Sequence, residues 1–175
     1  AGQQPFLAGE VGFGKAHADH ADRLAGVVEE GVQAGDVPFA DPTNKKYPID
    51  TMKPGDHFIT NDPWLSSGHL HDITVVTPTF VDGKPIAMFA CTIHVVDIGG
   101  RGFGPDGRPV YEEGIFIPIM KLAREGTMNE DLLEMVRHNV REQDQVLGDI
   151  FSCAASNEEG SRYLVQMMRE YKITD

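Results

Sequence analysis

The sequence contains little cysteine, little positive charge and no long hydrophobic run. Its two cysteines, Cys91 and Cys153, lie far apart and form no CxxC pair, so we expect a reducing, cytoplasmic location. Only 15 basic residues accompany 27 acidic ones, which gives a net charge of -12. Because phosphate groups are bound by clustered Lys and Arg, this excess of acid argues against a nucleic-acid partner or an anionic membrane surface. No apolar run approaches the length that spans a bilayer.

The chain starts at Ala1 with no initiator Met and no signal-peptide pattern, and it stops directly after a helical pattern. We therefore expect a fragment or a short form of a longer protein. Its 175 residues are enough for a single domain. The hydrophobic share of 41% and the charged share of 24% exclude a disordered chain or a coiled coil. With 19 Gly and 11 Pro residues, the composition favours a loop-rich α/β chain over a helical bundle.

The local patterns divide this single domain into three regions. Residues 1–50 are loop-rich, with one amphipathic helix predicted over residues 17–33. Residues 51–122 form a β region, and residues 123–175 form a helical region. The predicted fold is α/β in the α+β sense, with an antiparallel β-hairpin core, Gly-rich loops and a helical C-terminal third.

The β region contains a short strand pattern at residues 57–60 and a predicted hairpin. The hairpin strands, 73–80 and 85–96, are joined by Asp82-Gly83, a typical two-residue turn. We expect these two strands to pair with each other.

The helical region begins with Thr127 and Glu130, whose spacing fits a capping box at a helix start. Apolar residues then recur at helical spacing up to Val140. Two further helical patterns are predicted, one over residues 146–154 and one from about residue 156.

Four residues able to bind a metal gather around the predicted hairpin: His69, His71, Asp72 and His94. A plain two-residue turn would place His71 opposite His94, whereas a three-residue turn or one bulge would place Asp72 there. Pro78 within the first strand is consistent with such an irregularity. Either register brings a ligand from residues 69–72 to the imidazole of His94. Two imidazoles and a carboxylate suit a divalent metal such as zinc, manganese or iron, with positions left for water or substrate.

Two glycine-rich motifs have the spacing of nucleotide-binding loops but lack the context. Between Gly9 and Lys15 the spacing is that of a P-loop, yet Ala16 replaces the Ser or Thr that holds magnesium. Between Gly102 and Gly107 the spacing is that of a dinucleotide site, yet Pro105 prevents the expected helix start. We therefore expect no nucleotide site on this chain.

Several segments between about residue 50 and residue 171 resemble the hydantoinase B family in order and spacing. They are Gly55–Trp64, Gly68–Val76, His94–Gly100, Val110–Gly114, Ile117–Leu122, Asn139–Glu142 and Gln145–Asp149. The family includes B-type subunits of N-methylhydantoinases, 5-oxoprolinases and lactamases, and related subunits of acetone and acetophenone carboxylases. The resemblance implies that His69, Asp72 and His94 are the metal ligands, and it thereby selects the bulged register. Family subunits are several times longer than this chain.

The resemblance further implies an ATP-dependent opening of a small cyclic amide, such as a hydantoin, oxoproline or lactam. An A-type partner subunit that binds ATP and magnesium would phosphorylate the amide oxygen, and this chain would direct water onto the activated carbon. Asp97 and Glu112 are candidates for a catalytic base, and they are equally suited to capping loops or orienting ligands. Two alternatives stay open. One is a subunit of an ATP-dependent ketone carboxylase, and the other is a non-catalytic interaction fragment. A hetero-oligomer is expected.

Overall fold

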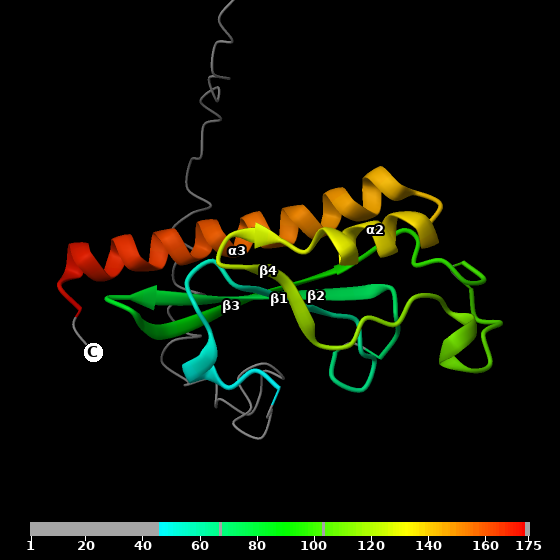
Figure 1. The fold of residues 1–175 in the computed structure, drawn as a ribbon, viewed down its shortest axis with the longest axis horizontal. Helices are drawn as coiled ribbons and strands as arrows, with labels where there is room; N and C mark the ends of the chain where they lie inside the picture. Colours follow the sequence, from blue (N-terminus) through cyan, green and yellow to red (C-terminus); the bar gives the residue numbers. More distant parts are fainter. Residues whose placement is uncertain (1–45, 67, 103, 174–175) are drawn as a thin grey trace, which may run out of the picture.

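The computed structural model describes residues 46–66, 68–102 and 104–173. Within them, one five-stranded antiparallel sheet has the order β3-β2-β1-β4-β5 and is followed by helices α2 and α3 (Figure 1). The predicted α+β fold is thereby confirmed; the helix predicted over residues 17–33 lies outside the described residues. The elements are η1 (Ile49–Thr51), β1 (His57–Thr60), β2 (Asp72–Val81), β3 (Lys84–His94), η2 (Val110–Glu112), β4 (Met120–Arg124), β5 (Thr127–Met128), α2 (Glu130–Asn139) and α3 (Gln143–Tyr171).

The predicted hairpin is formed by β2 and β3. Asp82 and Gly83 both adopt a positive φ, 50° and 79°, which is the conformation that a two-residue hairpin turn requires. The register then shifts by one residue, because Phe80 pairs with Pro85 whereas Thr79 pairs with Ala87. The turn is thus the plain two-residue one, and a bulge beside the turn supplies the shift. It lies next to Pro85, which has no N–H to give to the strand ladder, and not at Pro78.

The sheet extends beyond the predicted β region. Strands β4 and β5, which the sequence analysis did not identify, are joined by Glu125-Gly126, where both residues have a positive φ. The sheet therefore continues to Met128, and the helical region starts at Glu130 instead of residue 123. Strand β3 ends at His94, two residues before its predicted end.

Buried Asp56 holds the β4–β5 turn against the start of β1. Its carboxylate accepts hydrogen bonds from the backbone N–H groups of Lys53 (3.0 Å) and Glu125 (3.2 Å) and from the Lys121 ammonium (2.6 Å). Burial alone would raise the pKa of Asp56, but these donors outweigh it and hold the pKa below its ordinary value.

The helices differ from their predicted boundaries. Thr127 belongs to β5, and the cap of α2 is Asn129, whose side-chain oxygen accepts the Leu132 N–H at 3.2 Å. The capping-box prediction was therefore wrong by two residues. The two patterns predicted over residues 146–154 and from about 156 form one continuous helix, α3, which runs along the hairpin in Figure 1.

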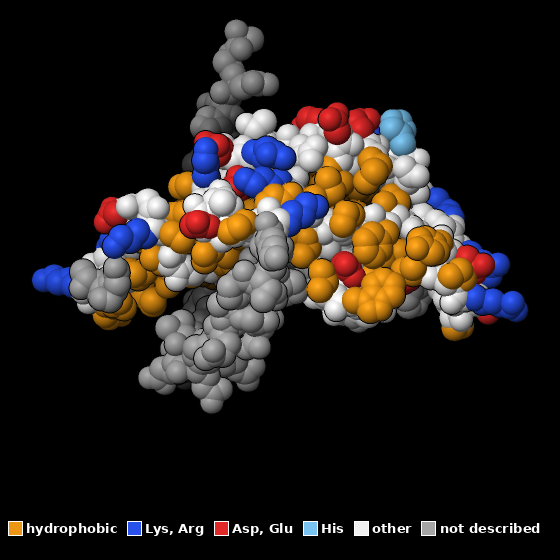
Figure 2. All heavy atoms as spheres, turned by 60° about the horizontal axis from the view of Figure 1, so that its bottom comes forward, with side chains coloured by type: hydrophobic (Ala, Val, Ile, Leu, Met, Phe, Trp, Pro, Cys, Tyr) orange, Lys and Arg blue, Asp and Glu red, His pale blue; other side chains and the backbone are white. Residues whose placement is uncertain are grey.

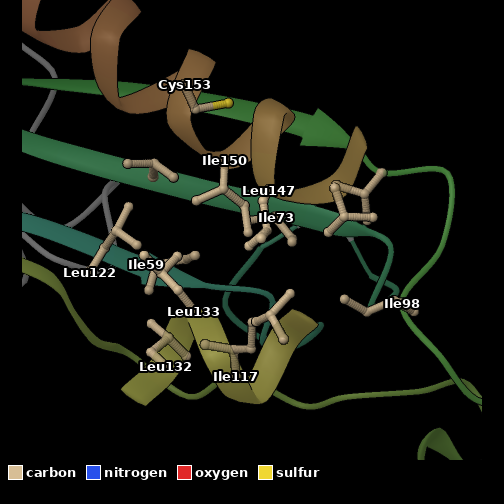
Figure 3. Packing of buried hydrophobic residues seen from close by; sticks show 14 of the residues in the cluster. Ile59, Ile73, Ile98, Ile117, Leu122, Leu132, Leu133, Leu147, Ile150 and Cys153 are labelled. Carbon is tan, nitrogen blue, oxygen red and sulfur yellow. The ribbon is translucent and has the colours of Figure 1, made fainter. Parts of the chain in front are cut away.

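The main core lies between the sheet and the two helices (Figure 3). Ile59 and Ile73 from the sheet meet Leu133 of α2 and Ile150 of α3. Polar contacts fasten the C-terminal half of α3: the Asn157 amide donates to the Val75 carbonyl (2.9 Å), the His57 ring lies 2.9 Å from Glu158, and the Thr79 and Ser161 hydroxyls are 2.6 Å apart.

The opposite face of the sheet carries a smaller cluster of Met52, Phe58 and Val76. Figure 2, turned so that the underside of Figure 1 comes forward, shows hydrophobic side chains gathered on this side. Because side chains alternate along a strand, Asp72 shares this face with Val76. The end of the hairpin far from its turn therefore presents Asp72 and its partner His94 on the face that α3 does not cover. Among the described residues, none of the helices has the length and apolarity needed to cross a membrane.

Candidate metal centre

The loop that leads into β2 is held in place by polar contacts. The buried amide of Asn61 donates to the carbonyls of Leu70 and Ile115, both at 2.8 Å. Asp62 accepts the backbone N–H of Trp64 at 3.0 Å and turns the chain. Asn61 thus ties the loop before β2 to the segment that follows η2, although the two are distant in the sequence.

Asp72 lies between two histidines at the end of the hairpin. Its Oδ2 is 3.1 Å from Nε2 of His69, and its Oδ1 is 2.9 Å from Nδ1 of His94. The register places Asp72 directly opposite His94, so the bulged register is confirmed and the alternative with His71 in that position is wrong.

One nitrogen or oxygen from each of His69, Asp72 and His94 lies within 4.8 Å of the other two. Ligands on opposite sides of one ion are roughly 4.2 Å apart when each bond is about 2.1 Å. The spacing and the chemistry of this donor set therefore fit one divalent cation of the zinc or manganese type.

His71 is buried, with 2% of its surface exposed. Its ring stacks on that of His94, with 5.4 Å between centroids and 16° between planes. Its Nδ1 is 3.5 Å from Oε1 of Glu113, and Nδ1 of His69 is 3.7 Å from the same oxygen. That oxygen also accepts the backbone N–H of Leu70 at 3.0 Å. The structure thus adds Glu113 to the cluster, a residue that the sequence analysis missed.

Glu112, which the sequence analysis named as a candidate catalytic base, contacts arginines instead of histidines. Its Oε2 accepts the backbone N–H of Arg108 at 3.2 Å and lies 3.4 Å from Nε of Arg101. Successive side chains of a 3₁₀ turn point in directions about 120° apart, so neighbouring glutamates at the end of η2 face different groups. The sequence offers no spacing rule that would have distinguished Glu113 from Glu112, because η2 itself was not predicted.

Two glycines let the segment after η2 approach the loop after β3. At Gly114 (φ 149°), an added Cβ would lie 2.1 Å from the Ile98 carbonyl oxygen. At Gly100 (φ 56°), it would lie 2.5 Å from the Glu112 carbonyl oxygen. These contacts leave no room for a side chain, and they fix the backbone on either side of Glu113.

Asp97 is buried at the start of the loop after β3. Its carboxylate accepts hydrogen bonds from the N–H of Gly99 (3.0 Å), the backbone N–H of Arg141 and the Arg141 guanidinium (2.7 Å). Burial acts to raise the pKa of Asp97, but these donors hold it below its ordinary value. The contacts are those of a loop cap, and a catalytic role for Asp97 or Glu112 stays a prediction.

A cleft of about 810 Å³ opens beside the histidines. Its lining includes His69, His71 and Glu113 on one side and Arg101 and Arg108 in the Gly-rich loop. The volume lies within the range of roughly 300–1,000 Å³ that is typical of small-molecule sites. Asp72 and His94 are not part of this lining, so His69 connects the candidate metal ligands to the cleft.

Curated relatives of this chain include enzymes that act on cyclic amides. The caprolactamase beta subunit of Pseudomonas jessenii is 30% identical over 127 residues, which are 71% of this chain and 22% of that subunit. A 5-oxoprolinase of Pestalotiopsis fici is 33% identical over 134 residues, which are 70% of this chain and 10% of that protein. The chain thus spans less than a quarter of the length of these relatives.

Solved structures show the same fold. The crystal structure of the ATP-dependent caprolactamase from Pseudomonas jessenii matches with a TM-score of 0.65 and 29% identity, over 71% of this chain and 22% of that one. A nucleotide-free acetone carboxylase matches with a TM-score of 0.63 and 22% identity, over 74% of this chain and 17% of that one.

The family model described as hydantoinase B/oxoprolinase matches residues 26–175. This match includes the segments on which the resemblance was based, among them those that carry His69, Asp72 and His94. The chain therefore belongs to the hydantoinase B/oxoprolinase family.

Proposed function

We propose that this chain is the metal-binding part of the B-type component of an ATP-dependent cyclic-amide hydrolase. The observation that carries the proposal is the convergence of His69, Asp72 and His94 in a chain of this family. The relatives named for 5-oxoproline and caprolactam support a cyclic amide as the substrate class.

His69, Asp72 and His94 would hold the divalent ion, with zinc and manganese as the leading candidates. When bound, such an ion supplies a positive charge that polarises a carbonyl group or acidifies a water molecule. Asp72 contributes one carboxylate oxygen toward each imidazole and thereby orients both rings. The stacked, buried ring of His71 supports His94 from the inside and keeps bulk water away from that side.

The cleft beside His69 is where the substrate would bind. Amide hydrolysis is slow because the nitrogen donates electrons to the carbonyl carbon, and phosphorylation of the amide oxygen removes this stabilisation. In the proposed sequence, the γ-phosphoryl group of ATP is transferred to the amide oxygen and ADP leaves. Water then adds to the activated carbon, and the ring C–N bond of this adduct breaks as the nitrogen takes up a proton, which leaves an acyl phosphate. A second water hydrolyses the acyl phosphate to a carboxylate and free phosphate.

An A-type ATP-binding subunit is proposed to perform the phosphorylation. Within the described part of the chain, the dinucleotide-like glycine spacing at residues 102–107 belongs to the loop that lines the cleft and starts no helix. The P-loop-like spacing at residues 9–15 lies outside the described residues. A hetero-oligomer in which ATP and magnesium bind to the partner follows from this division of roles.

The test is an ATP-turnover assay of the purified protein together with its A-type component and added Mn²⁺ or Zn²⁺. Hydantoins, 5-oxoproline and lactams are compared with ketones plus bicarbonate. We expect ADP and ring-opened product with at least one cyclic amide. Turnover with ketone and bicarbonate alone would establish the carboxylase alternative, and full ATP-dependent activity without the A-type component would contradict the proposed partner.

A further inference from the structure

The glycine-rich loop between Arg101 and Arg108 lines the cleft beside the histidines. Both arginines belong to the lining, together with Gly102, Gly104 and Gly107. Two guanidinium groups thus flank a stretch of backbone that carries few side chains. Guanidinium groups and open backbone N–H groups are the donors that bind the oxygens of phosphoryl and carboxylate groups.

Two glycines of this loop are explained neither by packing nor by backbone conformation. An added Cβ at Gly104 or Gly107 would meet no atom within 4 Å, and neither residue has a positive φ. Gly100 and Gly114, by contrast, are packed so tightly that a side chain would not fit. A glycine without such a constraint in the lining of a cleft leaves its backbone open to the close approach of a ligand.

Arg101 is held at the cleft by three contacts. Its backbone N–H donates to the Glu112 carbonyl at 3.0 Å, its Nη1 donates to the Asp106 carbonyl at 3.3 Å, and its Nε lies 3.4 Å from Oε2 of Glu112. The side chain still exposes 59% of its surface. Because a guanidinium has five N–H groups and Nη2 takes no part in these contacts, Arg101 is fixed on one side and can donate on the other.

Arg108 supplies the second guanidinium. Its backbone N–H donates to Oε2 of Glu112 at 3.2 Å, the same oxygen that faces Arg101, so that one carboxylate holds both ends of the loop. No residue in the described part of the chain forms a hydrogen bond or an ion pair with the Arg108 guanidinium. In a chain with a net charge of -12, this cation is available to an anionic ligand.

Three carboxylates share the cleft with these arginines, and an anion must bind in their presence. That of Glu112 is held by the two ends of the loop. That of Glu113 faces the histidine rings, at 3.5 and 3.7 Å. The third belongs to Asp106, which is exposed to solvent, where its charge is screened. None of the three therefore offsets the charge of Arg108 by direct contact.

We propose that the loop of residues 101, 102 and 104–108 is an oxyanion-binding subsite of the cleft: Arg101 and Arg108 hold the oxygens of a small anionic group, which approaches the bare backbone at Gly104 and Gly107. The phosphoryl group of an activated amide and the carboxylate of a substrate such as 5-oxoproline share this chemistry. The binding of an oxyanion is a property of this chain alone, whereas its assignment to the substrate rests on the proposed function.

Trp64 provides a local signal for binding. It is the single tryptophan of the chain, it lines the same cleft, and 75% of its surface is exposed. The metal-free protein is titrated at constant ionic strength with inorganic phosphate, 5-oxoproline or uncharged caprolactam, at about pH 8, above the ordinary titration range of imidazole. We expect a saturable change in Trp64 emission with at least one of the two anions, with a dissociation constant of about 0.1–10 mM. No saturable change with either anion over this range would overturn the proposal.

Arg108→Gln removes the cation without removing any contact that the described residues make with its side chain. It should weaken anion binding roughly 10-fold or more, because hydrogen bonds to a charged group are lost, and it should leave any response to caprolactam unchanged. Arg108→Lys, which keeps the charge but not the planar fork, should recover part of the affinity. The anion whose binding depends on Arg108 identifies the source: phosphate indicates a phosphoryl group, and 5-oxoproline indicates a carboxylate.

Arg162→Gln is the matched control. Arg162 is a 54% exposed arginine on α3 that pairs with Glu159, much as Arg101 pairs with Glu112, and it is not part of the cleft lining. Its replacement should leave anion binding unchanged. An equal loss in Arg108→Gln and Arg162→Gln would indicate a general effect of net charge, and either this result or unchanged binding in Arg108→Gln would overturn the proposal.

The loop backbone is tested with Gly104→Ala and Gly107→Ala. The added Cβ meets no atom of the protein within 4 Å, so the urea unfolding midpoint should stay the same, whereas the Cβ should obstruct the bound anion and weaken its binding. Gly148→Ala on α3, where the added Cβ is equally free of neighbours, should change neither quantity. Unchanged anion binding in both loop variants would overturn the proposed approach to the backbone.

The outcome is independent of the test of the proposed function, because neither ATP nor a metal nor the A-type component enters these titrations. Anion binding that depends on Arg108, in a protein without ATP-dependent amide turnover, would retain the subsite and reject the proposed function. Amide turnover without such anion binding would retain the proposed function and reject the subsite.

Discussion

His94→Ala is the most direct test of the candidate metal centre. The His94 side chain is 45% exposed and lies at the last residue of β3, so its removal should cost little folding energy, about 0.5 kcal/mol or less. Complete four-ligand zinc sites contribute about 10–16 kcal/mol, which is roughly 2.5–4 kcal/mol for each ligand. We therefore expect a loss of metal affinity of roughly 100- to 1,000-fold, because about 1.4 kcal/mol corresponds to a factor of ten.

The assay is elemental analysis of bound metal, followed by titration with Mn²⁺ and Zn²⁺ and circular dichroism as the folding control. His138→Ala is the matched variant, since His138 is a 73% exposed histidine on α2 and is absent from both candidate ligand groups. It should retain full metal affinity.

His71→Ala and Asp72→Ala complete the test. Asp72→Ala should abolish metal binding, because the Asp72 carboxylate contacts the rings of both His69 and His94. His71→Ala should retain most of the metal but lose stability, because it removes a ring that is 2% exposed. Full metal occupancy in folded His94→Ala would refute the assignment, and loss of metal in His71→Ala but not in Asp72→Ala would transfer the ligand role to His71.

Three further predictions concern the fold and its titratable groups. Gly160→Ala in α3 should lower the free energy of unfolding, measured by urea titration, by about 1–3 kcal/mol, because the added Cβ would lie 2.7 Å from an aromatic ring of β3. Gly148→Ala, where an added Cβ would have no atom within 4 Å, should be neutral or stabilising in the same titration. Asp56→Asn should cost about 3–5 kcal/mol at pH 7, because Lys121, 13% exposed, loses its buried partner. The pKa of Asp56 is lowered in the folded state, so its contribution to stability is present above the unfolded pKa of about 4 and is lost as the pH falls through the folded pKa. The free energies of unfolding of the unmodified protein and of Asp56→Asn should therefore converge in acid. A difference that stays constant with pH would contradict the assignment. Burial raises the pKa of the Cys153 thiol to about 12, so iodoacetamide at pH 8 should modify it only after unfolding, and rapid labelling of the native protein would count against the packing of α3.

The hairpin illustrates what local sequence predicts well. Asp82-Gly83 identified the turn because its residues tolerate the positive φ that a two-residue turn needs, and both adopt it. The register, however, depends on Ile86, which has no partner on β2 because Pro85 pairs with Phe80 and Ala87 with Thr79. The local pattern left the two registers open. Only the resemblance to a family selected the one that the structure has.

In the helical region, by contrast, a local sequence signal led to a wrong prediction. The Thr127 and Glu130 spacing satisfied a capping rule, yet Thr127 pairs with Arg124 in the sheet and Asn129 caps the helix. β5 pairs with β4 on the side that β1 does not occupy. This pairing places Thr127 in the sheet and moves the start of the helix to Glu130. Glu125-Gly126 was a turn signal of the same kind as Asp82-Gly83, and it would have identified β4 and β5.

The sequence by itself determined the family and the hairpin, because motifs and turn residues act over a few neighbouring positions. The choice of His69, Asp72 and His94 as candidate ligands came from the resemblance to that family. Only the tertiary structure decided that Glu113, and not Glu112, faces the histidines. That choice depends on how two loops distant in the sequence pack against each other at Asn61, Gly100 and Gly114. Such contacts reflect the exclusion of side chains and the pairing of buried polar groups across the fold, which no spacing within one segment encodes.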